Sequence, residues 1–323
     1  MMTSTASLFN PKQFIDEQIA KIRADVKGHA VIATSGGVDS TVAAAIVGRA
    51  LGKELTAVYV DTGFMRKGET DQVKDILSHL GIDVRIIRAG DEFLAALKGV
   101  TDPEKKRKII GEKFIRIFER VAKEVKAQYL VQGTIAPDWI ESGGGARDVI
   151  KSHHNVGGLP KDMHLKLVEP LYDLYKDEVR KVARELGLAI AERQPFPGPG
   201  LAIRVMGELT KENVELVRQA CDIVETEIEL AFKAGKLNAL PWQYFAVLLP
   251  VRSVGVQGDI RAYGHTMCVR AVASIDAMSA TYFHLPHDVL EKISRRITNT
   301  LKDHVNRVVF DITDKPPGTV EWE

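Results

Sequence analysis

The sequence predicts an α/β protein that begins with a doubly wound parallel sheet and continues into a smaller α+β domain. In the first 190 residues, short apolar runs without polar alternation are separated by stretches with helical periodicity. This order is typical of parallel sheets that are covered on both faces. A cluster of prolines and glycines then interrupts the chain at residues 194–200, and the order of elements changes beyond it. The length of 323 residues is enough for two domains with separate cores.

Four apolar runs in the first part predict the strands of the parallel sheet. Each run is short and lacks the alternation of a strand with one exposed face; they are residues 30–34, 55–60, 84–87 and 128–132. Ligands of such sheets bind beyond the carboxyl ends of the strands. The segments that directly follow these runs are therefore the first candidates for chemistry.

Helical stretches lie between and after these strands. Residues 40–51 and 70–80 are two of them, and Gly81 after the second is typical of a helix C-cap. Residues 103–126 form a long amphipathic stretch with apolar side chains at helical spacing, and residues 177–187 are helical again.

Residues 133–164 show no clear period and contain several glycines and charges. Connections this long are usually lids or binding loops. We place this lid loop in a first domain, residues 1–196, and assign residues 197–323 to the second domain. In that second domain the sequence predicts strands at residues 201–206, 245–249, 266–273 and 307–312, and helices at 211–234 and 288–302.

The composition excludes several classes of protein. Lys and Arg number 44 against 43 Asp and Glu, a net charge of +1, so the overall basic field of a nucleic-acid-binding protein is absent. No apolar run is long enough to span a bilayer, and residues 1–10 lack a secretory core. Cys221 and Cys268 lie in no CxxC, which argues against a disulfide framework or a cysteine-rich zinc site. We expect a cytoplasmic protein without nucleic-acid or membrane partners.

The strongest local signal is SGGVDS, residues 35–40, between the first predicted strand and the first predicted helix. Two glycines let the backbone approach an anion closely, and N–H groups at a helix N-terminus attract phosphate. Ser35 and Ser40 can add hydroxyl donors, and Asp39 can bind magnesium. The sequence has no GxxxxGK[ST], so a kinase or GTPase loop is not predicted. A plain glycine-rich turn before a serine-capped helix is the alternative.

This loop resembles the pyrophosphate-binding loop of the N-type ATP pyrophosphatases, which cleave ATP between its α and β phosphates and adenylate a substrate oxygen. The superfamily includes GMP synthase, NAD synthetase, argininosuccinate synthase and tRNA-thiolating enzymes. Further segments resemble GMP synthase over nearly the whole chain. They are VDTGFMRK (60–67), PEKKRKIIG (103–111), QGT (132–134), PDWIES (137–142), IKSHHNVGGLP (150–160), FPGPGLAIR (196–204), LPVRSVGVQGD (249–259) and KPPGTVEWE (315–323).

The resemblance implies an adenine nucleotide α-hydrolase-like fold, a C-terminal dimerisation domain and the reaction of a ligase. XMP, ATP and ammonia would give GMP, AMP and pyrophosphate through an adenyl-XMP intermediate. Single-chain family members carry an N-terminal class I glutamine amidotransferase domain, whereas here SGGVDS begins at residue 35 and neither cysteine has a nucleophile-like context. We therefore expect the separate ATP-pyrophosphatase subunit, a homodimer supplied with ammonia by a glutaminase partner. The apolar run at 245–249 fits either that dimer interface or a buried core strand.

The resemblance also implies the residues that bind ATP and Mg²⁺. Asp39 and Asp138 are the candidate metal ligands, and Lys151 and Lys161 in the lid would act with Asp39 in catalysis by neutralising phosphate charge. From the residues alone, Asp138 also fits an exposed turn, and the two lysines a solvated surface. The implied ATP-binding residues are Ser35, Gly36, Gly37, Val38, Asp39, Ser40, Val60, Gly133 and Asp138.

A second set of residues is implied for XMP: Arg107, Gln243, Arg307, Lys315, Val320 and Glu321. The forked donors of arginine suit a phosphate. Glu321 would accept hydrogen bonds from purine N–H groups, with Trp322 packing to anchor the segment. Arg204 and Arg252 are lower-ranked contacts. Without the resemblance, the basic run 105–108 would indicate only a solvated helix face.

Three other functions are weighed against this one. Another N-type ATP pyrophosphatase, such as NAD synthetase, does not account for the segments 196–204 and 315–323. A non-catalytic nucleotide-binding regulator has no need of the intact SGGVDS loop and Asp138. A tRNA-modifying enzyme would need a basic groove and catalytic cysteines, which the balanced charge and the two scattered cysteines do not supply.

Overall fold

The computed structural model describes residues 9–140, 165–188, 194–257, 260–275 and 278–323. The chain divides into two compact units. The first comprises Met1–Asp61, Glu69–Arg88 and Glu112–Arg193, and the second comprises Thr62–Gly68, Ala89–Gly111 and Gln194–Glu323. Two segments that precede the proline-rich linker therefore belong to the second unit. None of the helices in the described part of the chain has the length and apolar character of a membrane-spanning segment.

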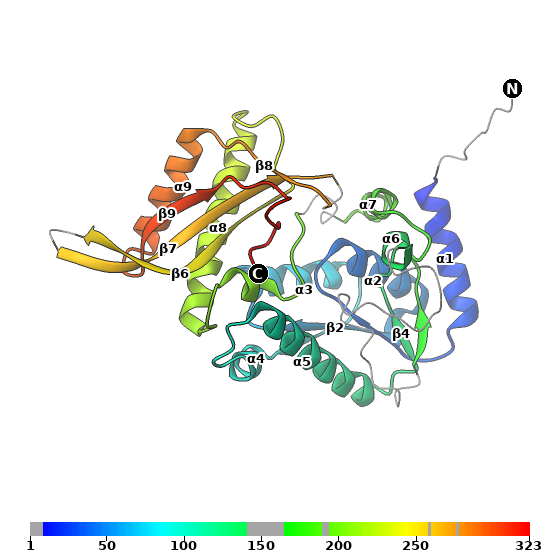
Figure 1. Ribbon diagram of the computed structural model, residues 1–323. Helices are drawn as coiled ribbons and strands as arrows, with labels where there is room; N and C mark the ends of the chain where they lie inside the picture. The colour runs from blue at the N-terminus through cyan, green and yellow to red at the C-terminus, as the bar shows by residue number, and fades with distance from the viewer. Residues whose placement is uncertain (1–8, 141–164, 189–193, 258–259, 276–277) are drawn as a thin grey trace, which may run out of the picture. The chain divides into compact units, whose positions relative to one another are not determined.

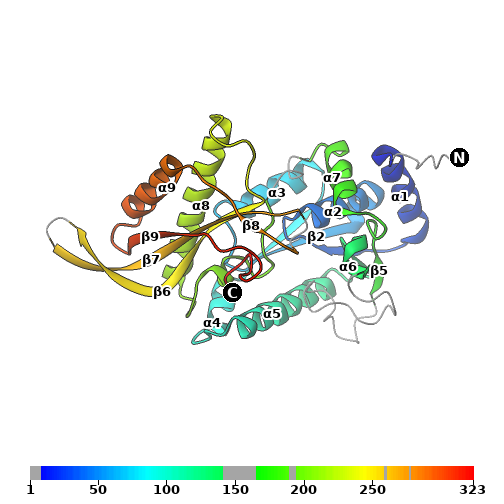
Figure 2. The same cartoon turned by 45° about the horizontal axis from the view of Figure 1, so that its top comes forward.

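The first unit is built on a five-stranded sheet in which every neighbouring pair is parallel (Figures 1 and 2). The strand order β3-β2-β1-β4-β5 confirms the predicted doubly wound parallel sheet. β1 and β4 are neighbours but are joined through two other strands, so the topological switch point lies between them. The strands are β1 (Ala30–Ala33), β2 (Leu55–Asp61), β3 (Val84–Arg88), β4 (Tyr129–Val131) and β5 (Lys166–Val168).

The burial pattern explains which of these strands the sequence reveals. β1 and β4 are almost completely buried, as is β2, because helices cover both faces of the central sheet. β3 and β5 lie at the edges and keep exposed residues. The four predicted strands are present, whereas the three-residue edge strand β5 is not among the predictions.

The helices of the first unit pack their apolar faces against the sheet and each other. α2 is the most buried, with every residue from Thr41 to Val47 inaccessible, and α1, α2 and α7 pack together. Each fully buried Val or Ile here contributes about 1.5–3 kcal/mol. The helices are α1 (Pro11–Asp25), α2 (Val38–Leu51), η1 (Gly52–Glu54), α3 (Glu69–His79), α6 (Ala136–Ile140) and α7 (Lys176–Glu185); α5 (Pro103–Glu124) is divided between the units at Gly111.

The second unit confirms the predicted α+β domain. Its long antiparallel pair, β6 with β7, runs from Gln243 paired with Val272 to Gln257 paired with Ile260, and β9 pairs with β7 in parallel. α8 and α9 pack on one another and on β6 and β9, respectively (Figure 1). The elements are α4 (Gly90–Ala96), η3 (Gly200–Arg204), α8 (Lys211–Lys233), β6 (Gln243–Gln257), β7 (Ile260–Ala273), β8 (Thr281–Tyr282), α9 (His287–Thr300) and β9 (Val305–Asp311).

The predicted strand at residues 201–206 is wrong. This segment is the short 3-10 helix η3, and only Val205 makes an isolated bridge to Leu248. Gly200 begins it with a φ of 64°, at a point where a Cβ atom would lie 2.3 Å from the Phe64 carbonyl oxygen. Because the helix is buried on all sides, its apolar run shows no periodicity that distinguishes it from a strand.

Candidate functional site

The SGGVDS loop folds into a compact turn between β1 and α2. Gly36 has a φ of 77°, a conformation that favours glycine. The Ser35 hydroxyl accepts from the Gly37 N–H at 3.3 Å and lies 3.3 Å from the Ser40 hydroxyl. Ser40 and Thr41 both donate through their hydroxyls to the Gly37 carbonyl, at 3.2 and 2.8 Å. The loop thus fixes two hydroxyl groups and two glycines at the carboxyl end of β1.

The N-terminus of α2 lacks the side-chain cap that α1 and α8 have. In α1 the Asn10 side chain accepts from the Gln13 N–H at 3.2 Å, and in α8 Thr210 accepts from Asn213 at 3.0 Å. α2 instead has Gly37 at its N-cap, with no side-chain hydrogen bond. A glycine N-cap leaves room for an external anion to interact with the first-turn N–H groups and the positive end of the helix dipole.

The segment after β4 closes on this loop at the switch point. A Cβ atom at Gly133 would lie 2.9 Å from the carbonyl carbon of Asp39 and 3.0 Å from the Ser40 nitrogen. Only glycine allows this approach, since ordinary contacts begin near 3.4 Å. The structure therefore brings Gly133 together with the loop at Asp39 and Ser40. The other predicted residues of this loop are Ser35, Gly36, Gly37 and Val38.

Asp138 has a structural contact of its own. Its Oδ2 accepts from the Ile135 N–H at 3.1 Å. Asp138 is at the third position of α6 and reaches back to the residue before the helix, as the acidic partner of a capping box does. A carboxylate offers about four acceptor positions, more than this one cap uses.

The other residues predicted for ATP differ in what they can contribute. Val60 is 3% exposed near the end of β2, so its side chain belongs to the core and only its backbone can meet a ligand. Lys151 and Lys161, with most of the predicted lid loop, lie outside the described residues. Among the described residues, no group of three or more His, Cys, Asp or Glu side chains could hold a metal ion.

In the second unit, Gln243 and Glu321 come together from segments far apart in the sequence. Gln243 Nε2 donates to Glu321 Oε1 at 2.7 Å. Arg204 donates to both oxygens of the same carboxylate, from Nε to Oε2 at 3.0 Å and from Nη2 to Oε1 at 2.7 Å. Glu321 is thus held by one amide and one forked guanidinium, and its side chain remains 13% exposed.

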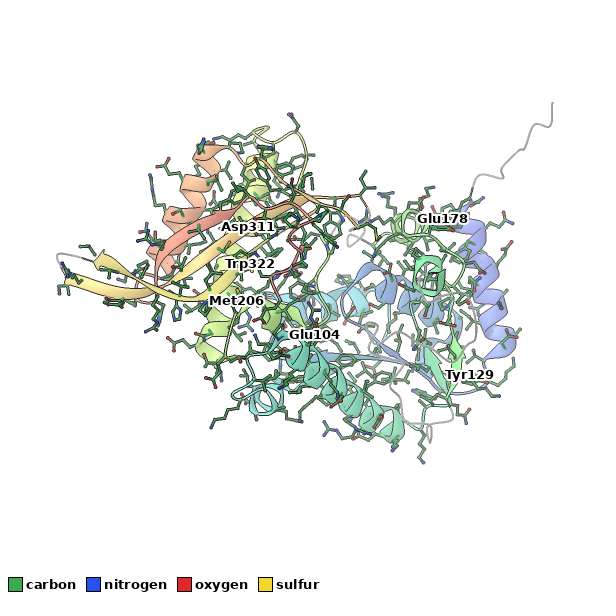
Figure 3. The ribbon with its side chains drawn as sticks, in the orientation of Figure 1. Glu104, Tyr129, Glu178, Met206, Asp311 and Trp322 are labelled. Atoms are coloured by element: carbon green, nitrogen blue, oxygen red, sulfur yellow. The ribbon has the colours of Figure 1, made fainter. Side chains whose placement is uncertain are left out.

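Arg270 fixes the segment that leads to Glu321. Its guanidinium donates to the Val320 carbonyl at 2.9 Å, to the Thr319 carbonyl at 2.8 Å and to Asp311 Oδ2 at 2.7 Å. Trp322 Nε1 also donates to Asp311 Oδ2, at 3.0 Å (Figure 3). Val320 therefore contributes its backbone carbonyl to this anchor. Trp322 attaches the same segment to Asp311 through its indole N–H.

The remaining predicted XMP residues have other partners in this unit. Arg107 donates to the main-chain oxygen of Glu323. Arg307 lies four residues before Asp311 on β9, about 13 Å along the strand, and donates to the Ser253 hydroxyl at 3.2 Å. Lys315 exchanges backbone hydrogen bonds with Ala280.

Three strongly buried cations are the residues that sequence reasoning ranks low or misses. Arg204 is expected only as a minor contact, and Lys106 and Arg270 are not among the expected residues, yet all three are 0% exposed. Each has an acidic partner more than 40 residues away along the chain. Arg204 binds Glu321, Lys106 binds Glu323 and Arg270 binds Asp311. The sequence signal that could have found Arg204 and Arg270 is a single cation in an otherwise apolar segment, as in AIRVM and CVRAVA. Lys106 lies in a basic run and carries no such signal.

Burial shifts the pKa of several groups in this unit. Burial, followed by the Arg252 guanidinium at 3.1 Å, lowers the pKa of His265 below its usual value. Burial raises the pKa of Glu323, although Lys106 opposes it. Burial also raises the pKa of the Cys221 thiol, and that of Cys268 to about 12, so neither is a thiolate at neutral pH.

The doubly wound sheet and the glycine-rich anion loop at its switch point define a nucleotide-binding α/β protein. Residues 29–194 match the family model of the queuosine biosynthesis protein QueC, and residues 231–322 match that of the GMP synthase C-terminal domain. The chain belongs to the GMP synthase family. It is 55% identical to a subunit of the glutamine-hydrolysing GMP synthase of Thermoplasma acidophilum, covering 96% of this chain and 98% of that protein. It is 57% identical to the corresponding subunit from Pyrococcus furiosus, covering 97% of each.

Two solved structures are similar to part of the chain at low sequence identity. NMN synthetase from Francisella tularensis is 16% identical, with a TM-score of 0.47, covering 72% of this chain and 89% of that one. The ammonia-dependent NAD synthetase from Campylobacter jejuni is 14% identical, with a TM-score of 0.46, covering 70% of this chain and 88% of that one.

Proposed function

We propose that this chain synthesises GMP from XMP, ATP and ammonia, as the ATP-pyrophosphatase subunit of a two-subunit glutamine-hydrolysing GMP synthase. The observation that carries the proposal is the full-length similarity to subunits of glutamine-hydrolysing GMP synthases. The enzyme would be a ligase, with ammonia supplied by a separate glutaminase subunit. The glycine-rich loop at the end of β1 supports an ATP-dependent reaction.

ATP fits the loop because its pyrophosphate would occupy the uncapped N-terminus of α2. Ser35 and Ser40 supply hydroxyl groups, and Ser35 and Gly37 are exposed, so the loop can meet a ligand. Asp39 and Asp138 would hold Mg²⁺, since carboxylate oxygens are the ligands this hard cation prefers. When bound, the cation neutralises the charge that develops on the departing pyrophosphate.

XMP would be recognised by residues of the second unit. Glu321 can accept from the purine N–H groups, with Gln243 and the backbone at Val320 beside it. Arg107, Arg307 and Lys315 supply positive charge suited to the 5′-phosphate.

The reaction follows from the poor leaving ability of the C2 oxygen of XMP. Attack of that oxygen on the α-phosphorus of ATP breaks the bond to pyrophosphate and forms adenyl-XMP. Ammonia then adds at C2, the C2–O bond breaks, and AMP leaves with the oxygen. The protein accelerates such steps mainly by positioning and charge neutralisation.

The proposed enzyme has two domains, a lid loop and a dimer interface. Residues 1–196 would form the ATP-pyrophosphatase domain, and residues 197–323 the dimerisation and XMP-binding domain. Residues 133–164 would be the lid, with Lys151 and Lys161 on the phosphates. The chain would be a cytoplasmic homodimer. Apolar side chains on the outer part of the β6–β7 pair, such as Val256 and Ile260 at 75% and 73% exposure, support a homodimer.

A product assay tests the proposal. The purified chain is incubated with ATP, Mg²⁺, XMP and either ammonium or glutamine, and GMP, AMP and pyrophosphate are quantified. We expect equal amounts of the three products with ammonium and none with glutamine. No GMP and no XMP-dependent AMP release with ammonium present would instead indicate another adenylated substrate or a binding-only role.

A further inference from the structure

Among the described residues of the second unit, three cationic side chains are fully buried, and all three bind the same short segment. Buried charges persist only where partners compensate for the lost hydration. The partners here belong to residues 319–323: Glu323 for Lys106, Glu321 for Arg204, and the Thr319 and Val320 carbonyls for Arg270. The segment that carries Glu321 is therefore held by buried positive charge.

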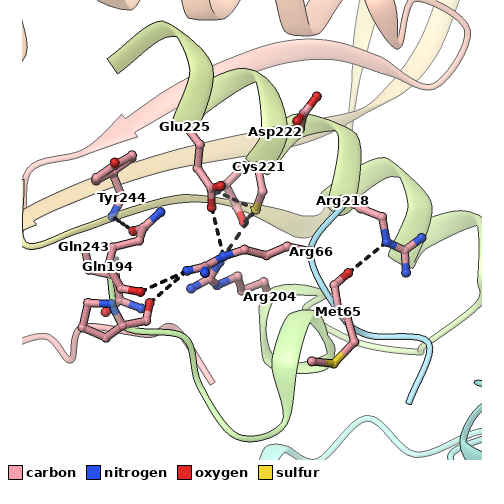
Figure 4. Close-up of polar contacts among 12 residues, drawn as sticks. Met65, Arg66, Gln194, Arg204, Arg218, Cys221, Asp222, Glu225, Gln243 and Tyr244 are labelled. Carbon is pink, nitrogen blue, oxygen red and sulfur yellow. Dashed lines mark hydrogen bonds and ion pairs between the residues drawn. The ribbon is translucent and has the colours of Figure 1, made fainter. Parts of the chain in front are cut away.

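Arg204 is the member of this set that controls the Glu321 carboxylate itself. Its two hydrogen bonds form a fork on both oxygens, at 3.0 and 2.7 Å. Its guanidinium carbon lies 4.1 Å from the centroid of Phe245, and its Nη1 lies 3.9 Å from Cys221 Sγ (Figure 4). Burial alone would lower the pKa of Arg204, but the adjacent Glu321 carboxylate outweighs it, so the pKa lies above its usual value.

This geometry separates the roles of the two charged partners. Arg204 is 0% exposed, so its guanidinium is inaccessible to a nucleotide in solution, whereas the Glu321 side chain is 13% exposed. A forked guanidinium fixes the plane of a carboxylate as well as its charge. The orientation of the Glu321 acceptor positions therefore depends on Arg204.

We propose that Arg204 is a positioning residue for purine recognition: it acts through Glu321, which it holds oriented to accept hydrogen bonds from the N–H groups of the purine ring. This inference rests on the proposed function, in which Glu321 binds XMP. Arg204 touches no substrate itself, and its effect on XMP passes through the carboxylate.

Arg66 provides a matched control in the same part of the unit. It is also buried, with a side chain 7% exposed, and its guanidinium carbon lies 4.3 Å from the Phe196 ring, which Arg204 also faces at 5.2 Å. Its ion-pair partner is Glu225, at 3.3 Å, and not Glu321 (Figure 4). Replacing Arg66 by lysine disturbs a comparable buried arginine without touching the carboxylate.

The test is a double-mutant cycle on the full chain, with ammonium as the nitrogen donor. Arg204→Lys keeps the charge but loses the fork. We expect it to raise the KM for XMP roughly 10- to 100-fold, the loss of about one charge-assisted hydrogen bond, while the KM for ATP stays within about twofold. Arg66→Lys leaves the KM for XMP unchanged. In a Glu321→Gln background, Arg204→Lys causes no further increase in the KM for XMP, because both changes act through the carboxylate of Glu321.

The outcomes distinguish this inference from the proposed function. If Glu321→Gln leaves XMP binding unchanged while GMP still forms, the assigned role of Glu321 is wrong and the inference fails with it. If Glu321→Gln weakens XMP binding but the effect of Arg204→Lys is absent or fully additive, the positioning role alone is overturned. Should Arg204→Lys not fold, Phe245→Leu removes the ring beneath the guanidinium and is expected to raise the same KM, by a smaller factor. An unchanged KM in that variant also overturns the inference.

Discussion

Gly133 is the position at which one methyl group most directly tests the geometry of the ATP loop. In Gly133→Ala, the new Cβ would lie 2.9 Å from the carbonyl carbon of Asp39 and 3.0 Å from its oxygen. Both atoms belong to the backbone of the first turn of α2, so no side-chain rotation can relieve the contact. Ordinary separation begins near 3.4 Å, so the two segments must part by about 0.5 Å.

Two consequences of this displacement can be estimated. Overpacking of a well-ordered site costs about 1–3 kcal/mol of folding free energy. A shift of about 1 Å in a positioned group lowers the rate on the order of 100-fold, so half that shift lowers kcat/KM for ATP about tenfold. Both effects arise from the contact alone, because Gly133 has no positive φ that an alanine would strain.

The assay measures thermal unfolding and kcat/KM for ATP in Gly133→Ala, with Gly198→Ala as the matched control. A Cβ at Gly198 meets no atom within 4 Å, so that variant is expected to behave as the wild type. If Gly133→Ala retains both the wild-type stability and the wild-type kcat/KM, the close approach of the segment after β4 to α2 does not shape the site.

Three further predictions concern single groups. Asp138→Asn keeps an acceptor for the Ile135 N–H, so we expect stability to change by less than about 1 kcal/mol while the Mg²⁺ concentration for half-maximal activity rises at least about tenfold; equal Mg²⁺ dependence would limit Asp138 to capping. Because the pKa of His265 is lowered in the folded protein, the unfolded chain binds a proton at this residue at a higher pH than the folded chain does. The free energy of unfolding is therefore unaffected by this group above about pH 6.5, and it decreases as the pH falls toward the folded pKa. Denaturant titrations between pH 7.5 and 5.5 should show a smaller loss in His265→Gln than in the wild type, and parallel curves would contradict the assignment. Cys221 and Cys268 are buried with raised pKa values, so a thiol reagent at pH 8 should react with neither in the native protein and with both in guanidinium chloride; rapid labelling of the native protein would refute their burial.

The central sheet could be predicted because its sequence carries two signals, namely unbroken apolar runs at the strands and a glycine-rich turn before α2. β1 and β2 are covered on both faces, so their apolar runs are unbroken, and the glycines after β1 mark the start of α2. β5 could not be recognised, since a three-residue edge strand has no periodicity to detect. α1 carries signals that the prediction did not use: Asn10 caps it and Pro11 begins it.

The buried ion pairs of the second unit could not be predicted from the sequence. A lysine in the basic run 105–108 indicates a solvated face, yet Lys106 is fully buried because Glu323, more than 200 residues away, binds it. The pairing of Arg204 with Glu321 likewise spans 117 residues. No local pattern encodes such a pair, because each partner is unfavourable without the other. The residues that resemble a known family supplied Gln243 and Glu321, but they ranked Arg204, which binds both oxygens of Glu321, only as a minor contact.

Adenylation of XMP makes its C2 oxygen an oxygen of AMP, and isotope transfer detects this oxygen. XMP labelled with ¹⁸O at C2 is converted by the full chain with ATP, Mg²⁺ and ammonium, and the AMP and pyrophosphate are analysed by mass spectrometry. Adenylation of XMP places one ¹⁸O atom in each AMP formed and none in pyrophosphate. Unlabelled AMP produced together with GMP would contradict the adenyl-XMP route.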